Sequence, residues 1–150
     1  MAFDLDNLKT DPQKVKEGAE VSYRGGSKLI VAKHNNKDAE NYRMIETLKH
    51  SELFSKISDQ EASEAEMEEA EKISFEIENG ALAYHVLKGW KGIKRGGEEL
   101  KYTPELGFDL LSDPENADFR EDLIRISRNS GHYRPEEKAK ATVKKAAASS

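Results

Sequence analysis

The chain has 150 residues, of which 36% are hydrophobic and 35% charged, with a formal net charge of -5 and no cysteine. Globular domains average about 45–50% apolar and about 25% charged residues, so we expect one domain with a modest core and long solvated faces. The acidic balance argues against nucleic acid as a partner, and the lack of cysteine excludes disulfides and thiolate chemistry and fits a reducing cytoplasm. No run approaches the roughly 18 apolar residues of a membrane-spanning helix, and the N-terminus lacks the features of a signal peptide.

The first part of the chain predicts an arm and a β-hairpin. Residues 1–19 are mostly polar, and Phe3, Leu5 and Leu8 are expected to dock a short turn. Residues 20–24 and 28–32 then form two strand-like runs around a glycine turn, which is a hairpin signal. Because a two-stranded hairpin is marginal in water, we expect a helix of the same chain, or a partner, on its apolar face.

The middle of the chain predicts two long helical segments. An apolar stripe from Tyr42 to Ile57 has spacings of three and four, loosened near His50, which is typical of a helix. Ser58, with Glu61 three residues later, fits the capping box of a second helix.

The second helix begins in an acidic stretch, residues 59–71. This stretch is either a solvated helical face or an acidic surface that docks a basic segment of a partner. Residues 70–87 carry a wide apolar face. Gly80 lies inside this apolar face, and the sequence leaves open whether the helix kinks or breaks there. Gly89 and Gly92 are predicted to end the helix.

Two short helices are predicted toward the C-terminus. Residues 93–102 predict a loop or small β-ribbon around a glycine turn at Gly96. Thr103 is a helix N-cap followed by Pro104 at the first helical position, and a last helix is expected at about residues 116–129.

The expected fold class is α+β, mainly α, with an N-terminal β-hairpin followed by about four helices and a disordered basic C-terminal tail. The expected division is an N-terminal arm at residues 1–19, a single globular domain at 20–133 and the tail at 134–150. The tail has one β-branched apolar residue and no aromatic residue, too little apolar surface to offset the entropy of ordering.

No group of residues predicts an active site. The four histidines are scattered without the spacing of metal ligands. Neither glycine pair is followed by the Lys-Ser/Thr of a phosphate-binding loop. We therefore expect a protein that is not an enzyme, with no metal, no cofactor and no nucleic-acid or membrane partner.

Trp90 is the only tryptophan, and two roles for it are open. It either anchors the end of the long helix against the two C-terminal helices, or it is a partly exposed anchor in an interface, where tryptophan is enriched. A binder of long helices needs an apolar groove with rigid aromatic anchors. The candidate partner-binding residues are Phe75, Tyr84, Trp90 and Tyr102.

Six short motifs occur in a characteristic order. They are Gly-x-x-Val, Leu-Ile-Val-Ala, Val-Leu-Lys-Gly-Trp-Lys-Gly-Ile, Leu-Lys-Tyr-Thr-Pro-Glu, Leu-Leu-x-Asp and Phe-Arg-x-x-Leu, at residues 18–21, 29–32, 86–93, 100–105, 110–113 and 119–123. This ordered set resembles the tail assembly chaperones of long-tailed, siphovirus-type bacteriophages.

The resemblance implies a non-catalytic assembly factor that binds and solubilises the phage tape measure protein and promotes assembly of the tail tube. Such proteins act in the host cytoplasm and are usually absent from the mature virion. The resemblance also implies a longer, frameshifted form that contacts the tail-tube protein, with the codons of Lys144 and Lys145 as the candidate slippage site. Self-association is left open.

Two other functions remain open. One is a minor virion structural protein, such as a tail or head–tail connector subunit, in which the hairpin adds to a neighbour's sheet. The other is a small host-directed regulator that binds another protein.

Overall fold

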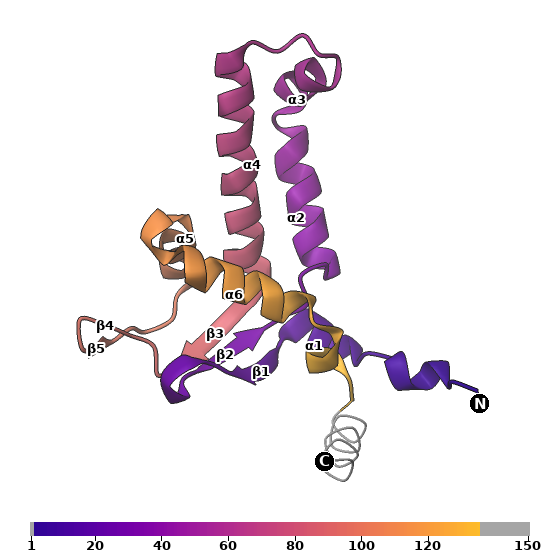
Figure 1. The fold of residues 1–150 in the computed structure, drawn as a ribbon, viewed down its shortest axis with the longest axis vertical. Coiled ribbons are helices and arrows are strands. Elements are labelled where there is room, and N and C mark those ends of the chain that lie inside the picture. Colours follow the sequence, from indigo (N-terminus) through magenta and orange to yellow (C-terminus); the bar gives the residue numbers. More distant parts are fainter. Residues whose placement is uncertain (1, 136–150) are drawn as a thin grey trace.

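A computed structural model of the chain describes residues 2–135. Figure 1 labels its helices and strands. In chain order these are α1 (Pro12–Glu17), β1 (Ala19–Ser22), β2 (Lys28–Val31), α2 (Lys37–Leu48), α3 (Ser51–Ser58), α4 (Glu64–His85), β3 (Leu87–Lys91), β4 (Lys94–Arg95), β5 (Glu98–Glu99), α5 (Pro104–Ser112) and α6 (Ala117–Arg128). Of the predicted tail at 134–150, everything after Pro135 lies outside the described residues.

Strand β2 is the centre of a three-stranded antiparallel sheet, with β1 on one side and β3 on the other. Leu29 of β2 pairs with Val21 of β1 and with Trp90 of β3. Alternate side chains of a strand share a face, and Leu29 and Val31 are both fully buried. This face of the sheet therefore forms one side of the hydrophobic core.

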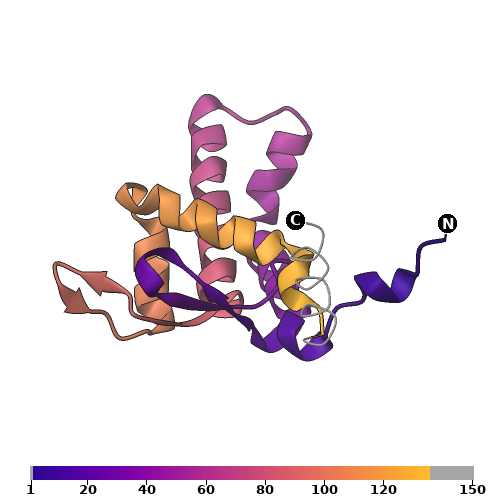
Figure 2. The same ribbon diagram turned by 60° about the horizontal axis from the view of Figure 1, so that its bottom comes forward.

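Helix α6 lies across the sheet (Figures 1 and 2). Phe119, Leu123 and Ile126 recur at spacings of three and four and give α6 one apolar side. Leu123 and Ile126 join the same buried cluster as Leu29 and Leu82. The last predicted helix is confirmed as α6, and it covers the core.

The predicted fold class is wrong. The sequence predicted an N-terminal hairpin followed by about four helices, whereas the described residues contain six α-helices and strands in two sheets. β1 and β2 do not form a separate hairpin ahead of a helical domain, because β3, far along the chain, completes their sheet. A two-stranded unit is marginal in water, and here a third strand as well as a helix supports it.

The strand that follows the long helix was not predicted. Helix α4 ends at His85, close to the predicted end at about Leu87, and Leu87–Lys91 is a strand where only helix-ending glycines were expected. Gly89 faces Ile30 in the pairing with β2, and a Cβ at position 89 would lie 3.3 Å from Cδ1 of Ile30. The backbone pairing with β2, which is a tertiary contact, overrides the local helical pattern.

Two local predictions near the C-terminus are confirmed. Gly96 and Gly97 both have positive φ, 59° and 81°, and turn the ribbon β4–β5, as a tight hairpin turn requires. The Thr103 hydroxyl accepts a hydrogen bond from the Leu106 amide at 3.1 Å and caps α5, with Pro104 in the first turn.

Helices α2, α3 and α4 form a projection that we call the helical arm. α2 and α4 run side by side away from the sheet, and α3 lies at the far end (Figure 1). The capping box of α4 is formed by Ser63 and Glu66, not by the predicted Ser58 and Glu61, since Ser58 ends α3. At 22 residues α4 is about 33 Å long.

The residues before Asp11 extend away from the body (Figures 1 and 2). Phe3, Leu5 and Leu8 are more than half exposed, so the prediction that they dock a short turn is wrong. The body begins at Asp11, whose amide donates to the carbonyl of Tyr133 at 2.6 Å. No helix of residues 2–135 has both the length and the apolar character needed to cross a membrane.

Candidate interaction surface on the helical arm

The structure separates the four candidate partner-binding residues into two pairs. Phe75 and Tyr84 lie on α4 and are each 39% exposed. Trp90 is 7% exposed on β3, and Tyr102 is half-buried beside it. Only Phe75 and Tyr84 present enough surface to meet a partner.

Trp90 and Tyr102 attach the segment after β3 to the body. Their rings pack edge to face with centroids 4.9 Å apart. The Trp90 indole Nε1 donates to the Leu100 carbonyl at 2.7 Å, and the Tyr102 hydroxyl donates to the Leu87 carbonyl at 2.6 Å. Both polar ends are satisfied inside the protein, so this pair packs the core.

An open aromatic groove lies where α2, α4 and α5 meet at the base of the helical arm. Tyr84 stacks on Phe108 of α5, with ring centroids 6.0 Å apart and an interplanar angle of 13°, and lies 6.2 Å from Tyr42 of α2. These rings and Ile73 and Ile77 line a groove of about 240 Å³. Three polar side chains also line it, those of Glu46, His50 and Glu76.

Gly80 explains how the groove forms. Helix α4 continues through this position rather than breaking, which decides between the alternatives that the sequence left open. A Cβ at position 80 would overlap the ring and hydroxyl of Tyr42. The glycine therefore lets α2 approach α4 closely, with the Tyr42 ring lying on the bare helix backbone.

A second apolar feature, which we call the α2 stripe, consists of Met44, Ile45 and Leu48. Their spacings of three and four place them on one side of α2, and all three are more than half exposed. None of the three is among the residues that line the aromatic groove. The groove and the α2 stripe are therefore two separate exposed features of the helical arm.

A half-buried ion pair joins α2 to α4 at the base of the helical arm. Arg43 of α2 contacts Glu78 of α4 with two nitrogens, at 2.8 and 3.1 Å, and His34 Nε2 lies 2.9 Å from the same carboxylate. Burial opposes the charge of Glu78, but the hydrogen bonds from His34 and Arg43 outweigh it and lower its pKa to about 2. This network holds α2 against α4 below the groove.

Phe75 lies on a different side of α4 from the groove. The guanidinium of Arg120 sits over its ring, 4.6 Å from the centroid, and also donates to the Asn79 side-chain oxygen at 2.7 Å. One face of Phe75 is therefore covered from α6. Tyr84 is the one predicted residue that the structure places in the groove.

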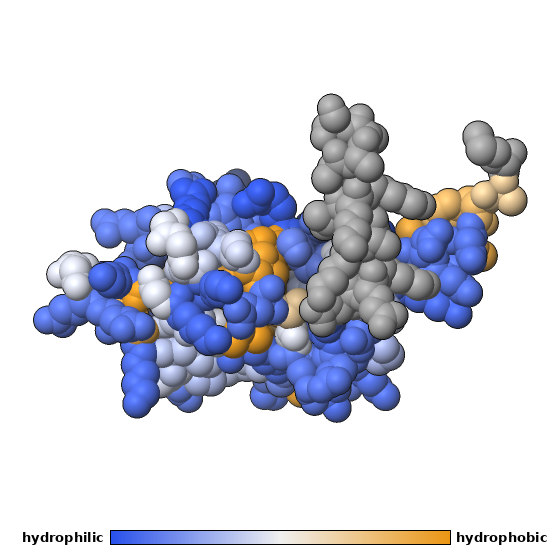
Figure 3. Space-filling view, turned by 90° about the horizontal axis from the view of Figure 1, so that it is seen from below, coloured by the Kyte–Doolittle hydropathy of each residue, from blue (hydrophilic) through white to orange (hydrophobic). Residues whose placement is uncertain are grey.

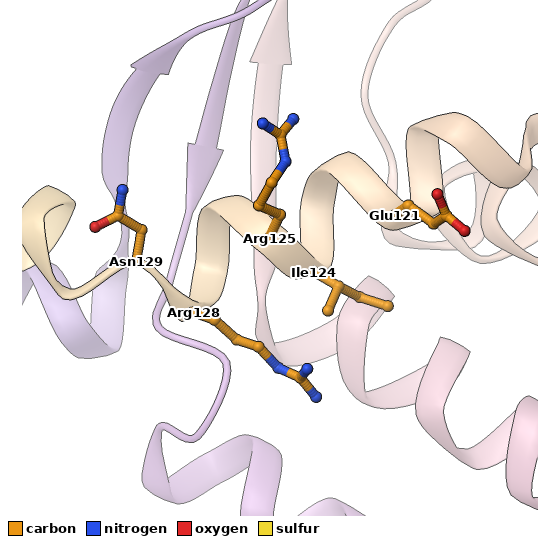
Figure 4. Close-up of a pocket in the computed structure, with 5 residues that line it drawn as sticks. All are labelled: Glu121, Ile124, Arg125, Arg128 and Asn129. Carbon is orange, nitrogen blue, oxygen red and sulfur yellow. The ribbon is translucent and has the colours of Figure 1, made fainter.

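A larger hollow, of about 440 Å³, runs along the outer side of α6. Arg125 points along the strands while Ile124 and Arg128 point away from it (Figure 4). Arg125 is occupied by an ion pair with Asp122 at 2.9 Å. These side chains diverge, so they do not form a set that converges on one ligand.

The family assignment agrees with the phage part of the resemblance. A family model described as YdaY prophage protein matches residues 30–145. The chain belongs to this family. The match begins within β2 and includes the helical arm, the groove and α6. No curated protein and no solved structure matches the chain. Membership in the prophage family makes the chain phage-derived, and the family description names neither a tail nor a chaperone role.

Sequence reasoning missed Tyr42 and Phe108 as groove residues and the exposure of the α2 stripe. The apolar residues of the stripe recur as they would on a helix that faces the core. Periodicity alone does not say which of these residues another element covers. The glycine at position 80 was the one available signal, because a glycine inside an amphipathic helix often marks a close approach by another element.

Proposed function

We propose that this prophage-family protein is a non-catalytic assembly factor. It binds a helical segment of a phage structural protein on the helical arm and keeps that partner soluble. The partner that the motif resemblance suggests is the tape measure protein of the same phage, and the assembly step is formation of the tail tube. The observation that carries the proposal is the open aromatic groove of Tyr42, Tyr84 and Phe108 on a helical arm that also exposes the α2 stripe.

The shape of this surface suits a helix as the ligand. An amphipathic helix presents apolar side chains at i, i+3, i+4 and i+7 and binds by laying this apolar face into a groove. Tyr84 and Phe108 are rigid aromatic anchors, and Met44 and Leu48 are adaptable aliphatic contacts. The tape measure protein of a long-tailed phage is expected to be a long helical protein of this kind.

The charges around the groove favour a basic partner. Glu46 and Glu76 line it, and the first half of α4 adds a series of exposed acidic residues. Carboxylates at the rim steer a partner with lysine or arginine beside its apolar residues and oppose an acidic one. This supports the second of the two interpretations of the acidic stretch at residues 59–71.

The rest of the proposal follows the family resemblance. The protein acts in the host cytoplasm, is absent from the mature virion and has a frameshifted longer form that contacts the tail-tube protein. The gene sequence tests the longer form. A slippery heptamer at the codons of Lys144 and Lys145 with an overlapping downstream reading frame supports it, and the absence of both refutes it.

Co-expression with the tape measure protein of the same prophage tests the binding function. The soluble fraction of the tape measure protein should rise when this chain is present. Leu48→Asp should abolish the effect, because it places a charge on the α2 stripe. Leu5→Asp is the matched control, since Leu5 is also exposed but belongs to the N-terminal segment, which extends away from the helical arm in Figure 1.

Two results would overturn the proposed function, and a third would overturn the proposed binding site. In one, the tape measure protein is equally insoluble with and without this chain. In the other, mass spectrometry of purified virions finds the chain in abundance, which favours the alternative of a minor virion structural protein. Equal loss of the effect in Leu48→Asp and Leu5→Asp would show that the helical arm is not the binding site.

A further inference from the structure

The N-terminal tip, residues 3–8, has the chemistry of a docking segment. Its three apolar side chains, Phe3, Leu5 and Leu8, are 65%, 73% and 53% exposed. Figure 3 shows hydrophobic residues collected on this tip at the side of the molecule. Asp4 and Asp6 alternate with them, so the tip is both apolar and acidic.

The tip has a regular local structure of its own. Residues 5–8 form a 3-10 turn capped by Asp4, whose carboxylate accepts from the Asp6 amide at 2.9 Å. Lys9 pairs with Asp6 at 2.9 Å. A short turn that exposes all its large apolar side chains gains little from its own packing, and such residues are normally covered by another surface.

A second feature matches the tip in size and chemistry. A pocket of about 330 Å³ is lined by residues of the β4–β5 ribbon, of α5, of the start of α6 and of the turn after β1. Aromatic and aliphatic side chains form most of its lining, with two cations and an amide among them. Tyr23 and Phe119 pack edge to face in it, with centroids 6.0 Å apart, and the Tyr23 hydroxyl is held by Asp122 at 2.6 Å. The pocket is therefore preformed.

The charges of the pocket are opposite to those of the tip. Lys94 and Arg95 line it, whereas Glu98 and Glu99, which face them across the ribbon, are not among the lining residues. An acidic segment with alternating apolar side chains therefore finds apolar walls and cations at one place.

The tip cannot be placed in the pocket of its own chain by a small movement. Both ribbon views show the tip and the β4–β5 ribbon on opposite sides of the body (Figures 1 and 2). The chain is attached to the body from Asp11 onward, through the hydrogen bond to Tyr133. A second copy of the chain can approach from outside and insert its tip without crossing the body.

We propose that the N-terminal tip of one copy docks in the Tyr23–Phe119 pocket of a second copy. Phe3, Leu5 and Leu8 fill the apolar pocket, and Asp4 and Asp6 face Lys94 and Arg95. The two surfaces are different, so the contact either closes reciprocally into a dimer or continues from copy to copy into a ring or chain. This self-association is independent of partner binding on the helical arm.

Sedimentation velocity of the full chain over a wide range of concentration tests this proposal. The wild type should associate, and Leu5→Asp should weaken association by roughly tenfold or more, because it removes one buried leucine and adds a buried charge. The pocket variant Lys94→Gln/Arg95→Gln should also weaken it. Glutamine is used because a carboxylate there would repel Glu98 and Glu99 across the ribbon.

A mixing experiment tests directly whether the tip of one copy meets the pocket of another. Leu5→Asp keeps an intact pocket and Lys94→Gln/Arg95→Gln keeps an intact tip, so a mixture of the two variants should form mixed dimers that neither forms alone. Lys101→Gln is the control for the pocket variant, because Lys101 is exposed and does not line the pocket.

Three results would overturn the proposal. The first is a wild type that stays monomeric at every concentration, as it would if the tip folded onto the hollow beside Val15 and Lys37 of its own chain. The second is association that Leu5→Asp leaves unchanged. The third is a mixture that associates no better than its components. Leu5→Asp should still solubilise the tape measure protein, so failure here is distinguishable from failure of the proposed function.

Discussion

Helix α4 belongs to two regions of the molecule that differ in packing. In its last turns Ala81, Leu82 and Ala83 are completely buried in the body, between the sheet and α5. In the helical arm, from Glu64 to about Ile77, Ala70 is its only buried residue. One continuous helix thus serves as a core element at one end and as a scaffold for an exposed surface at the other. Stability should reside in the body and partner binding in the helical arm.

The largest expected effect tests the body side of this comparison. Trp90→Ala should lower the free energy of unfolding by about 3–5 kcal/mol, because it removes a buried indole and orphans the Leu100 carbonyl. Chemical denaturation measures it. A folded variant with unchanged stability that loses partner binding would instead make Trp90 an interface residue and contradict its assignment to the core.

A change at the junction of the two regions should have an intermediate effect. Gly80→Ala should cost about 1–3 kcal/mol by overpacking against Tyr42, although alanine is the better helix former by about 1 kcal/mol. In a Tyr42→Ala background the same change should be neutral or stabilising. A double-mutant cycle from urea denaturation measures the coupling, and zero coupling would refute the close approach of α2.

The ion pair at the base of the arm predicts a pH dependence. The pKa of Glu78 is lowered from 4.5 to about 2 in the folded protein. Its contribution to stability is therefore fully present above pH 4.5 and is lost as the pH falls toward 2. The whole contribution is on the order of 3 kcal/mol.

Denaturation of the wild type and Glu78→Gln at several pH values measures this contribution. The stability difference between the two proteins should be largest at neutral pH and should shrink on acidification through this window. A difference that stays constant from neutral pH to pH 2 would show that the ion pair does not hold the arm.

The smallest stability effect is expected on the outer face of the arm. Ile45→Ser should change the free energy of unfolding by no more than about 0.5 kcal/mol, since Ile45 is more than half exposed. Thermal denaturation measures this change. In the co-expression assay the same variant should lower the soluble fraction of the tape measure protein. A loss comparable with that of Trp90→Ala would mean that the α2 stripe is packed and cannot serve as a binding surface.

Elements coded by local chemistry were predictable. Thr103 and Pro104 start α5 because the cap and the fixed φ of proline act within one turn. Gly96 and Gly97 turn the ribbon because both positions need positive φ. The loosening near His50 is likewise the break between α2 and α3.

The candidate site was predictable only in part. The sequence identified Tyr84 as a candidate partner-binding residue on a helix. It did not identify the other two rings of the groove, Tyr42 and Phe108, because they come from α2 and α5. Which helices meet at that point is set by packing among segments far apart in the chain. Trp90 was identified as notable, and only the pairing of β3 with β2 shows that it faces the core.

By itself, the sequence determined caps, turns, the helical periodicity and the acidic, cysteine-free character of this prophage-family protein, because these depend on neighbouring residues or on composition. The tertiary structure alone decided that residues 87–91 form a strand, that the sheet has three strands, and that the apolar residues of α2 and of the N-terminal tip stay uncovered. Each of these outcomes depends on which distant backbone or side chain is available to pair, and no local pattern encodes that.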